Sequence, residues 1–501
     1  MTLRKINSDE IRTYEYPRHP KTRSIDRLLI SLSSPILLQP HHYRSLSLCA
    51  LSRSTMSSSS SHNSFLSFVF FFIILTLTHS STEYLKLPLL PRTTLSNVSN
   101  ILAADLHRLS GRRTSPQSPL TSGAAMGSGQ YFADLRIGSP PQRLLLVVDT
   151  GSDLVWVKCS ACRNCSTNRR GSAFLPRHSR SFSPYHCYDS LCRLVPHPTP
   201  THCNNRTKLH TPCRYEYSYA DGSTTTGFFS KETTTFNTSS KKQEKIKNLA
   251  FGCGFKNSGP SVTGSSFNGA QGVMGLGRGP ISFSSQLGRK FGNTFSYCLL
   301  DYTLSPPPKS YLTIGASSHD VVSRKLFSYT PLVTNPLSPS FYYITIQSVS
   351  VDGVRLPINP SVWGIDLNGN GGTVVDSGTT LSFLPEPAYK PVLAAFRRRV
   401  RLPAAEEAAA LGFDLCVNVS GVARPRLPKL RFVLAGKSVL SPPAGNYFIE
   451  PVEGVKCLAV QPVRPGSGFS VIGNLMQQGY LFEFDLDRSR IGFSRHGCAV
   501  R

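Results

Sequence analysis

The sequence predicts an all-β protein with a few short helices, organised as two duplicated lobes. Its 501 residues include 38 Gly and 37 Pro, and these two residue types favour turns between short strands over long helices. A motif of six residues, described below, occurs twice and indicates an internal duplication. Short β-patterned runs recur along the chain at 131–137, 143–148, 247–252, 342–351, 372–375, 431–434, 455–460 and 479–485.

The composition excludes a disordered chain and a bundle of membrane helices, because 40% of the residues are hydrophobic and 17% are charged. The formal net charge of +27 is spread along the chain, whereas a nucleic-acid binder usually concentrates its charge. The densest basic run, 397–401, follows a helix-like stretch, and we interpret it as a solvated helix end with cations near the negative pole of the helix. We therefore expect no nucleic-acid partner.

An apolar run of 13 residues at 65–77 is too short to span a bilayer and fits the hydrophobic region of a secretory signal peptide. We expect translation to start at Met56, residues 56–81 to be the signal peptide, and 1–55 to be a disordered upstream extension. A transit peptide at 1–55 is the alternative, and its four acidic residues argue against it. We expect secretion to the extracellular space or cell wall, with the vacuole or chloroplast as alternatives, and no stable membrane anchor.

Residues 82–126 are polar and weakly patterned, with one helix-like piece near 97–109. Such a segment does not suffice for a compact core, so we interpret it as a removable pro-segment. From Gly127 the pattern becomes strand-like. The run Pro306-Pro307-Pro308 marks the boundary between an N-terminal lobe, 127–308, and a C-terminal lobe, 309–501.

Twelve cysteines remain when Cys49 is assigned to the extension, and an even number in an oxidising compartment predicts six disulfides. Cys416 and Cys457 form a natural pair far from the others, which leaves Cys298 and Cys498 for each other. The remaining eight crowd into a cysteine-rich insertion at positions Cys159, Cys162, Cys165, Cys187, Cys192, Cys203, Cys213 and Cys253. The spacing of the first three also suits a zinc or iron–sulfur site, but a secreted chain favours disulfides.

Five Asn-x-Ser/Thr triplets agree with a secretory route and mark candidate glycosylation sites. They begin at Asn97, Asn164, Asn205, Asn237 and Asn418.

The repeated motif is the most informative feature of the sequence. Residues 147–152, VVDTGS, reappear as VVDSGT at 374–379. Two apolar residues and a glycine follow each copy, at 273–275 and at 471–473. A duplicated lobe explains both pairs, and it predicts that the two motifs meet at a pseudo-two-fold axis.

The motif suits a pair of carboxylates that share a proton. Asp149 and Asp376 each end an apolar strand, the glycine two residues later allows a tight turn, and Ser152 or Thr379 can donate a hydrogen bond to the neighbouring carboxylate. Two carboxylates about 3 Å apart cannot both ionise, so they titrate as a pair. The ionised member can take a proton from water while the protonated member donates to a carbonyl oxygen, which is general acid–base hydrolysis of an amide.

These motifs resemble the two active-site motifs of the pepsin-like aspartic proteases. The resemblance covers about residues 127–501, and segments 129–132, 137–142 and 154–156 match the N-terminal strands of that family. The cysteine-rich insertion resembles the plant nepenthesin-like branch. The resemblance implies two pseudo-symmetric β-rich lobes with an active-site cleft between them. The vacuolar phytepsin type is excluded because the second lobe has no saposin-like insertion.

The resemblance also implies roles for individual residues. Tyr219 is the flap tyrosine and Trp156 supports the flap, although a surface-strand aromatic is an alternative role for Tyr219. Thr150 and Ser377 brace the two loops against each other, although both could be simple turn formers. The support residues of the two catalytic aspartates are Thr150, Gly151, Ser152, Ser377, Gly378 and Thr379.

We therefore expect a secreted aspartic endopeptidase, made as a zymogen, that acts as a monomer on protein or peptide substrates in an extended conformation. The alternative is a catalytically inactive pepsin-like binding or inhibitor module, but such modules typically lose a catalytic aspartate and both are intact here. We expect no cofactor and no metal, because the 13 His show no H-E-x-x-H spacing. The segment after Gly151 lacks a G-x-S-x-G elbow, so serine hydrolase chemistry is not expected.

Overall fold

The computed structural model describes residues 84–91, 129–160, 173–198, 211–219, 222–238, 242–259, 262–263, 269–301, 310–315, 326–463, 468–496 and 498. They belong to one compact unit, His79–Arg501. The expected extension, signal peptide, helix-like piece at 97–109 and triple-proline boundary lie outside the described residues. In the described part, strands dominate and the helices are short, so the all-β expectation is confirmed.

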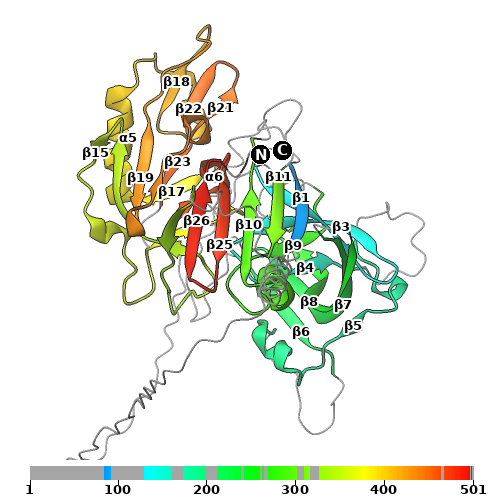
Figure 1. Ribbon diagram of the computed structural model, residues 1–501. Coiled ribbons are helices and arrows are strands. Elements are labelled where there is room, and N and C mark those ends of the chain that lie inside the picture. The colour runs from blue at the N-terminus through cyan, green and yellow to red at the C-terminus, as the bar shows by residue number, and fades with distance from the viewer. Residues whose placement is uncertain are drawn as a thin grey trace, which may run out of the picture. The chain divides into compact units, whose positions relative to one another are not determined.

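The largest sheet of the described residues has fourteen strands and contains elements from both halves of the chain. Strand β10 from the first half pairs with β25 from the second, as the neighbouring green and red arrows in Figure 1 show. In sheet order the strands are β12 (Ser328–Pro331), β26 (Arg490–Ser494), β25 (Leu481–Asp485), β10 (Thr294–Cys298), β11 (Ser310–Ile314), β1 (Leu85–Pro91), β2 (Tyr131–Ile137), β3 (Gln142–Asp149), β9 (Gly272–Gly275), β4 (Trp156–Lys158), β8 (Gln243–Ser258), β7 (Thr224–Asn237) and β5 (Ser183–Pro184), with β6 (Arg214–Ser218) paired to β7.

Three smaller sheets belong to the C-terminal half. The first has the order β13 (Tyr343–Ile344), β16 (Thr373–Val375), β24 (Ser470–Ile472), β17 (Ser382–Pro385) and β23 (Val460–Val463). The second has the order β15 (Val354–Arg355), β14 (Ile346–Val351), β19 (Leu430–Leu434) and β20 (Val439–Leu440). The third has the order β18 (Cys416–Asn418), β22 (Val455–Leu458) and β21 (Phe448–Val452).

The α-helices of the described residues are α3 (Phe283–Phe291), α5 (Glu386–Arg399) and α6 (Asn474–Gln477). Ser282 caps the N-terminus of helix α3, because its hydroxyl accepts the Ser285 N–H at 3.2 Å and satisfies one free donor of the first turn. Helix α5 ends with the arginine run in its last turn, near the negative pole of the helix, as expected. Within the described ranges, the 3-10 helices are η2 (Pro176–His178), η3 (Ser190–Leu194), η5 (Pro360–Trp363), η6 (Glu406–Leu411), η7 (Ala435–Lys437) and η8 (Ala444–Asn446).

The two copies of the motif lie in equivalent strand arrangements. In the first half β3 runs parallel to β9, with Asp149 beside Gly275, and β4 runs antiparallel to β9. In the second half β16 runs parallel to β24, with Val375 beside Ile472, and β17 runs antiparallel to β24. The internal repeat of the sequence is therefore also a repeat of the fold.

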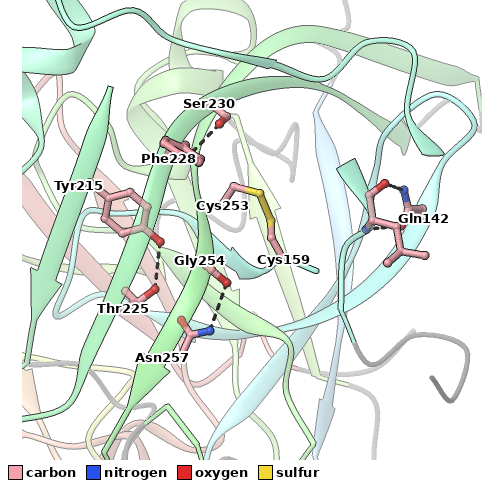
Figure 2. The surroundings of a disulfide bond; sticks show 10 residues. Gln142, Cys159, Tyr215, Thr225, Phe228, Ser230, Cys253, Gly254 and Asn257 are labelled. Atoms are coloured by element: carbon pink, nitrogen blue, oxygen red, sulfur yellow. Dashed lines mark hydrogen bonds between the residues drawn. A yellow bond between two sulfur atoms is a disulfide. The ribbon is translucent and has the colours of Figure 1, made fainter. Parts of the chain in front are cut away.

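Four disulfides join described cysteines, and they include the two pairs expected outside the insertion, Cys298–Cys498 and Cys416–Cys457. The other two are Cys159–Cys253 and Cys192–Cys213. Figure 2 shows the disulfide between Cys159, which directly follows β4, and Cys253 of β8. Cys187 is also disulfide-bonded, whereas Cys162, Cys165 and Cys203 lie outside the described residues.

Within the described ranges, no helix is both long and apolar enough to cross a membrane.

Strand β1 lies within 82–126, the segment expected to be unable to form a compact core of its own, and it contributes to the main core instead. It pairs with β11 on one side and with β2 on the other. Leu85, Leu87 and Leu89 are at most 6% exposed and belong to the main hydrophobic cluster. The reason is an alternation of leucine with Lys86 and Pro88, which is the two-residue period of a half-buried strand.

Shortening a buried leucine of β1 should destabilise the whole chain. We expect Leu87→Ala to lower the free energy of unfolding by about 2–5 kcal/mol through lost burial and a cavity. The control Lys86→Ala changes an exposed neighbour whose ammonium lies 4.1 Å from the centre of the Tyr311 ring, so its effect should stay below about 1 kcal/mol. Denaturant unfolding of the full chain measures both, and equal effects would show that β1 does not contribute to the core.

Candidate active site

The two motif copies form matching loops, which we call the first aspartate loop (149–153) and the second aspartate loop (376–380). In the first, Asp149 Oδ1 accepts the Gly151 N–H at 3.0 Å and Oδ2 accepts the Ser152 hydroxyl. In the second, Asp376 Oδ1 accepts the Gly378 N–H at 2.8 Å and Oδ2 accepts the hydroxyl of the residue three positions later, Thr379. The hydrogen bonds orient each carboxylate and compensate for its removal from water.

Both carboxylates are almost fully buried. Asp149 is 0% and Asp376 2% exposed, and the flanking hydroxyl residues are buried with them. Neither Asp149 nor Asp376 belongs to an ordinary surface turn, because such a turn would leave its carboxylate in water. The structure therefore places all the predicted residues of the two loops in one buried polar cluster.

The two loops contact each other through reciprocal hydrogen bonds between Thr150 and Ser377. The Thr150 N–H donates to Ser377 Oγ at 3.1 Å, and the Ser377 N–H donates to Thr150 Oγ1 at 2.9 Å. Each hydroxyl in turn donates to a carbonyl of the opposite half, Thr150 to Val375 at 3.2 Å and Ser377 to Val148 at 3.0 Å. Because each residue directly follows one aspartate, these bonds hold the two carboxylate-bearing loops together, as the bracing role requires.

A second set of buried polar side chains holds the backbone of the second aspartate loop. Gln477 Nε2 donates to the Asp376 carbonyl at 3.2 Å, and Asn474 Nδ2 donates to the Ser377 carbonyl at 3.0 Å. The Tyr297 hydroxyl donates to Gln477 Oε1. Sequence reasoning missed Asn474 and Gln477, although polar residues directly after the apolar segment at 471–473 were a usable signal.

The electrostatics of the site keep Tyr297 neutral. Burial raises the pKa of its phenol well above the usual range, and the nearby Asp376 charge raises it further. A neutral phenol can donate a hydrogen bond to Gln477 at every pH at which a carboxylate pair shares a proton. Tyr297 therefore remains a hydrogen-bond donor to Gln477, the residue that holds the second aspartate loop.

The proposed flap residues are in contact with each other. The indole N–H of Trp156, at the start of β4, donates to the Tyr219 hydroxyl at 2.5 Å. Tyr219 is only 3% exposed, so it is not a surface-strand aromatic. The flap tip at 220–221 lies outside the described residues. The geometry agrees with the flap role that the family resemblance implies for Tyr219 and Trp156.

Tyr215 anchors β6, the strand that leads to Tyr219, against β8. Its ring fills the space beside Gly252, where a Cβ would lie 2.6 Å from the ring, so only glycine fits there. Its hydroxyl bonds to Thr225 Oγ1 at 2.9 Å, as Figure 2 shows. The base of the flap hairpin is therefore fixed by packing as well as by strand pairing.

Comparison with known proteins matches both halves of the chain. Residues 131–316 match the family described as "Xylanase inhibitor N-terminal", and residues 341–495 match "Xylanase inhibitor C-terminal". The chain is 38% identical over 385 residues to Aspartyl protease family protein 2 of Arabidopsis thaliana, which covers 76% of this chain and 74% of that relative. It is 37% identical over 397 residues to aspartic proteinase nepenthesin-1 of Nepenthes gracilis, and this alignment covers 79% of this chain and 84% of that relative.

The chain belongs to the nepenthesin-like branch of the pepsin-like aspartic proteases. Its enzyme class is accordingly that of an aspartic-type endopeptidase.

Solved structures of other proteins share the fold of this chain. The crystal structure of basic 7S globulin from soybean covers 82% of this chain and 96% of that chain, with a TM-score of 0.58 and 19% identity. The crystal structure of edgp aligns with 82% of this chain and 94% of its own chain, with a TM-score of 0.60 and 22% identity. Identities this low support the two-lobed β fold alone.

The reciprocal bonds of this nepenthesin-like site should be energetically coupled. We expect Thr150→Val or Ser377→Ala to lower the free energy of unfolding by about 1–3 kcal/mol each, because each leaves buried partners unsatisfied. The double variant should lose less than the sum of the two, with a coupling of about 0.5–3 kcal/mol. Thr150→Ser keeps the hydroxyl and is the control. Strictly additive losses in denaturant unfolding would contradict the reciprocal contact.

Proposed function

We propose that the protein hydrolyses peptide bonds at acid pH by a water molecule activated between Asp149 and Asp376. The observation that carries the proposal is the joining of the two aspartate loops by Thr150 and Ser377. It supports a site in which two oriented, buried carboxylates belong to a single unit. The comparison with aspartic proteases over most of the chain supports the same reaction class.

The proposed reaction needs one proton shared by the pair. The ionised carboxylate takes a proton from water, and the water oxygen attacks the peptide carbonyl carbon while the other carboxyl group donates its proton to the carbonyl oxygen. The tetrahedral intermediate then collapses and the C–N bond breaks. The leaving nitrogen takes the proton held by one carboxyl group, while a hydroxyl of the intermediate returns its proton to the other carboxylate, which restores the single shared proton. The N–H groups of Gly151 and Gly378 keep both carboxylates oriented throughout.

We propose protein or peptide chains in an extended conformation as substrates, held beneath the Tyr219 flap. The bond from Trp156 to the Tyr219 hydroxyl would fix the phenol while the flap covers the substrate. We further propose a monomeric, glycosylated enzyme that is secreted to the extracellular space or cell wall. The inactive inhibitor alternative is not favoured, because both aspartates keep their complete hydrogen-bonded loops.

We also propose that the enzyme is made as a zymogen with 82–126 as its pro-segment. Strand β1 lies within this segment and pairs with both β2 and β11. Removal of 82–126 would break these pairings, so maturation is proposed to include a rearrangement of this part of the sheet. The proposed start of the mature chain near Gly127 lies just outside the described residues.

Each aspartate should be indispensable for turnover. We expect Asp149→Asn and Asp376→Asn to lower kcat by at least about a hundredfold, the lower end of the range for acid–base groups, because a coupled pair needs both members. Asp134→Asn is the control, since it neutralises a carboxylate of β2 that pairs with the exposed Arg143. The assay is acid hydrolysis of denatured globin with and without pepstatin. More than about 1% residual activity in a folded aspartate variant would reject this assignment.

The activity should follow a bell-shaped pH profile. It should fall at low pH, when both carboxyl groups are protonated, and at higher pH, when both are ionised. Because the proposed pair works with one shared proton, and two neighbouring carboxyl groups share a proton only in the acid range, we expect an optimum at roughly pH 3–5. A kcat/KM profile on an oligopeptide measures it, and an optimum near pH 8 would contradict a shared proton.

A further inference from the structure

Asp153 is a buried carboxylate that the proposed reaction does not use. It follows Ser152 in the first aspartate loop and is 8% exposed. Its Oδ1 accepts the Gly279 N–H at 2.8 Å, and its Oδ2 accepts the hydroxyl of Ser340. Burial raises the pKa of Asp153, so keeping a carboxyl group here carries an energetic cost.

The fold of the loop does not by itself require this carboxylate. In the second aspartate loop the equivalent position is Thr380, and that loop forms the same turn and the same bonds to its aspartate. The acid is therefore a feature of the first copy alone. What the carboxylate adds to the first copy is the pair of bonds to Gly279 and Ser340.

The surroundings of Asp153 are shaped to hold a carboxylate. A Cβ added at Gly277 would lie 2.3 Å from Oδ1, and one added at Gly279 would lie 2.2 Å from Oδ2. No other residue fits at either position without displacing the carboxylate. The glycine-rich stretch after β9 thus forms a cradle around the side chain of Asp153.

Ser340, the second partner, belongs to the other half of the chain. It precedes β13, where Tyr343 pairs with Val374 of β16, the strand that leads to Asp376. The cradle is tied to the same segment by the bond from the Arg278 N–H to the Ser340 carbonyl at 3.0 Å. The Tyr342 hydroxyl also donates to the Leu276 carbonyl at 2.6 Å. A continuous path of bonds and paired strands therefore runs from one aspartate loop to the other.

We propose that Asp153 is a positioning residue that, through Ser340, fixes the second aspartate loop relative to the first. It acts beside the Thr150–Ser377 contact as a further connection between the halves, which also share the β10–β25 pairing. The kinetic consequence rests on the proposed function, because only a hydrolytic pair needs both loops in register. A misplacement of about 1 Å between reacting groups can cost about a hundredfold in rate.

The test compares Asp153→Ala and Ser340→Ala with the conservative variant Ser340→Thr. The control is Glu232→Gln, which changes a carboxylate that is 1% exposed and accepts the hydroxyls of Ser179 and Ser181 within the N-terminal half. For each variant, kcat and KM on an oligopeptide at the optimal pH are measured. Hydrogen–deuterium exchange of peptides spanning 373–381 is measured on the same full-length samples, together with thermal unfolding.

We expect both alanine variants to lower kcat by about tenfold or more while KM stays within about twofold, because loop placement acts on the reacting groups rather than on substrate binding. Exchange should accelerate across 373–381, although neither substitution lies in that segment. Ser340→Thr should keep kcat and the exchange of 373–381 close to the wild-type values, because it retains the hydroxyl. Glu232→Gln should lower only the unfolding temperature.

Unchanged kcat and unchanged exchange at 373–381 in the folded alanine variants would overturn the proposal. The proposal also fails if Glu232→Gln reproduces their effects, since the role of Asp153 would then be general stability. If Asp153→Ala does not fold, Ser340→Ala decides alone, because it retains the carboxylate and its bond to Gly279. If the wild-type protein hydrolyses no peptide, the proposed function fails, and the exchange measurement still decides the inference.

Discussion

The reciprocal hydrogen bonds between Thr150 and Ser377 are the constraint on which the rest of the site depends. Each residue uses its N–H, as a donor, and its hydroxyl, as both donor and acceptor, toward the opposite half of the chain. The pair is buried, where an unsatisfied polar group is costly, so separating the loops would expose several unpaired groups at once. The loops therefore remain in contact, which is the arrangement that the proposed pair of Asp149 and Asp376 requires.

The strands deliver the loops to this contact. β3 and β16 each run parallel to a partner strand, β9 and β24, and each ends at its aspartate loop. The pairing of β10 with β25 joins the two halves in one sheet, so neither loop depends on side-chain contacts alone for its position. The same duplicated geometry explains why two carboxylates that lie 227 residues apart in the sequence have nearly identical hydrogen bonds.

The sequence sufficed to predict what is local or repeated and failed where partners are distant. The aspartate loops follow from six adjacent residues that occur twice, and the pair Cys416–Cys457 follows from its isolation. The eight insertion cysteines allow 105 connectivities, so the pair Cys159–Cys253 could not be chosen in advance. Gln477 and Asp153 were missed because their partners lie 101 and 187 residues away. Strand β1 was missed because its two prolines disguised a regular alternation of leucines.

The central claim is that Asp149 and Asp376 form one unit that holds a single shared proton. The most direct test is a neutron diffraction structure of the deuterium-exchanged protein near its optimal pH. Our account predicts one deuteron on the carboxyl pair and a water molecule bound to both residues. Two deuterons, none, or carboxyl groups too far apart to share a water molecule would contradict it.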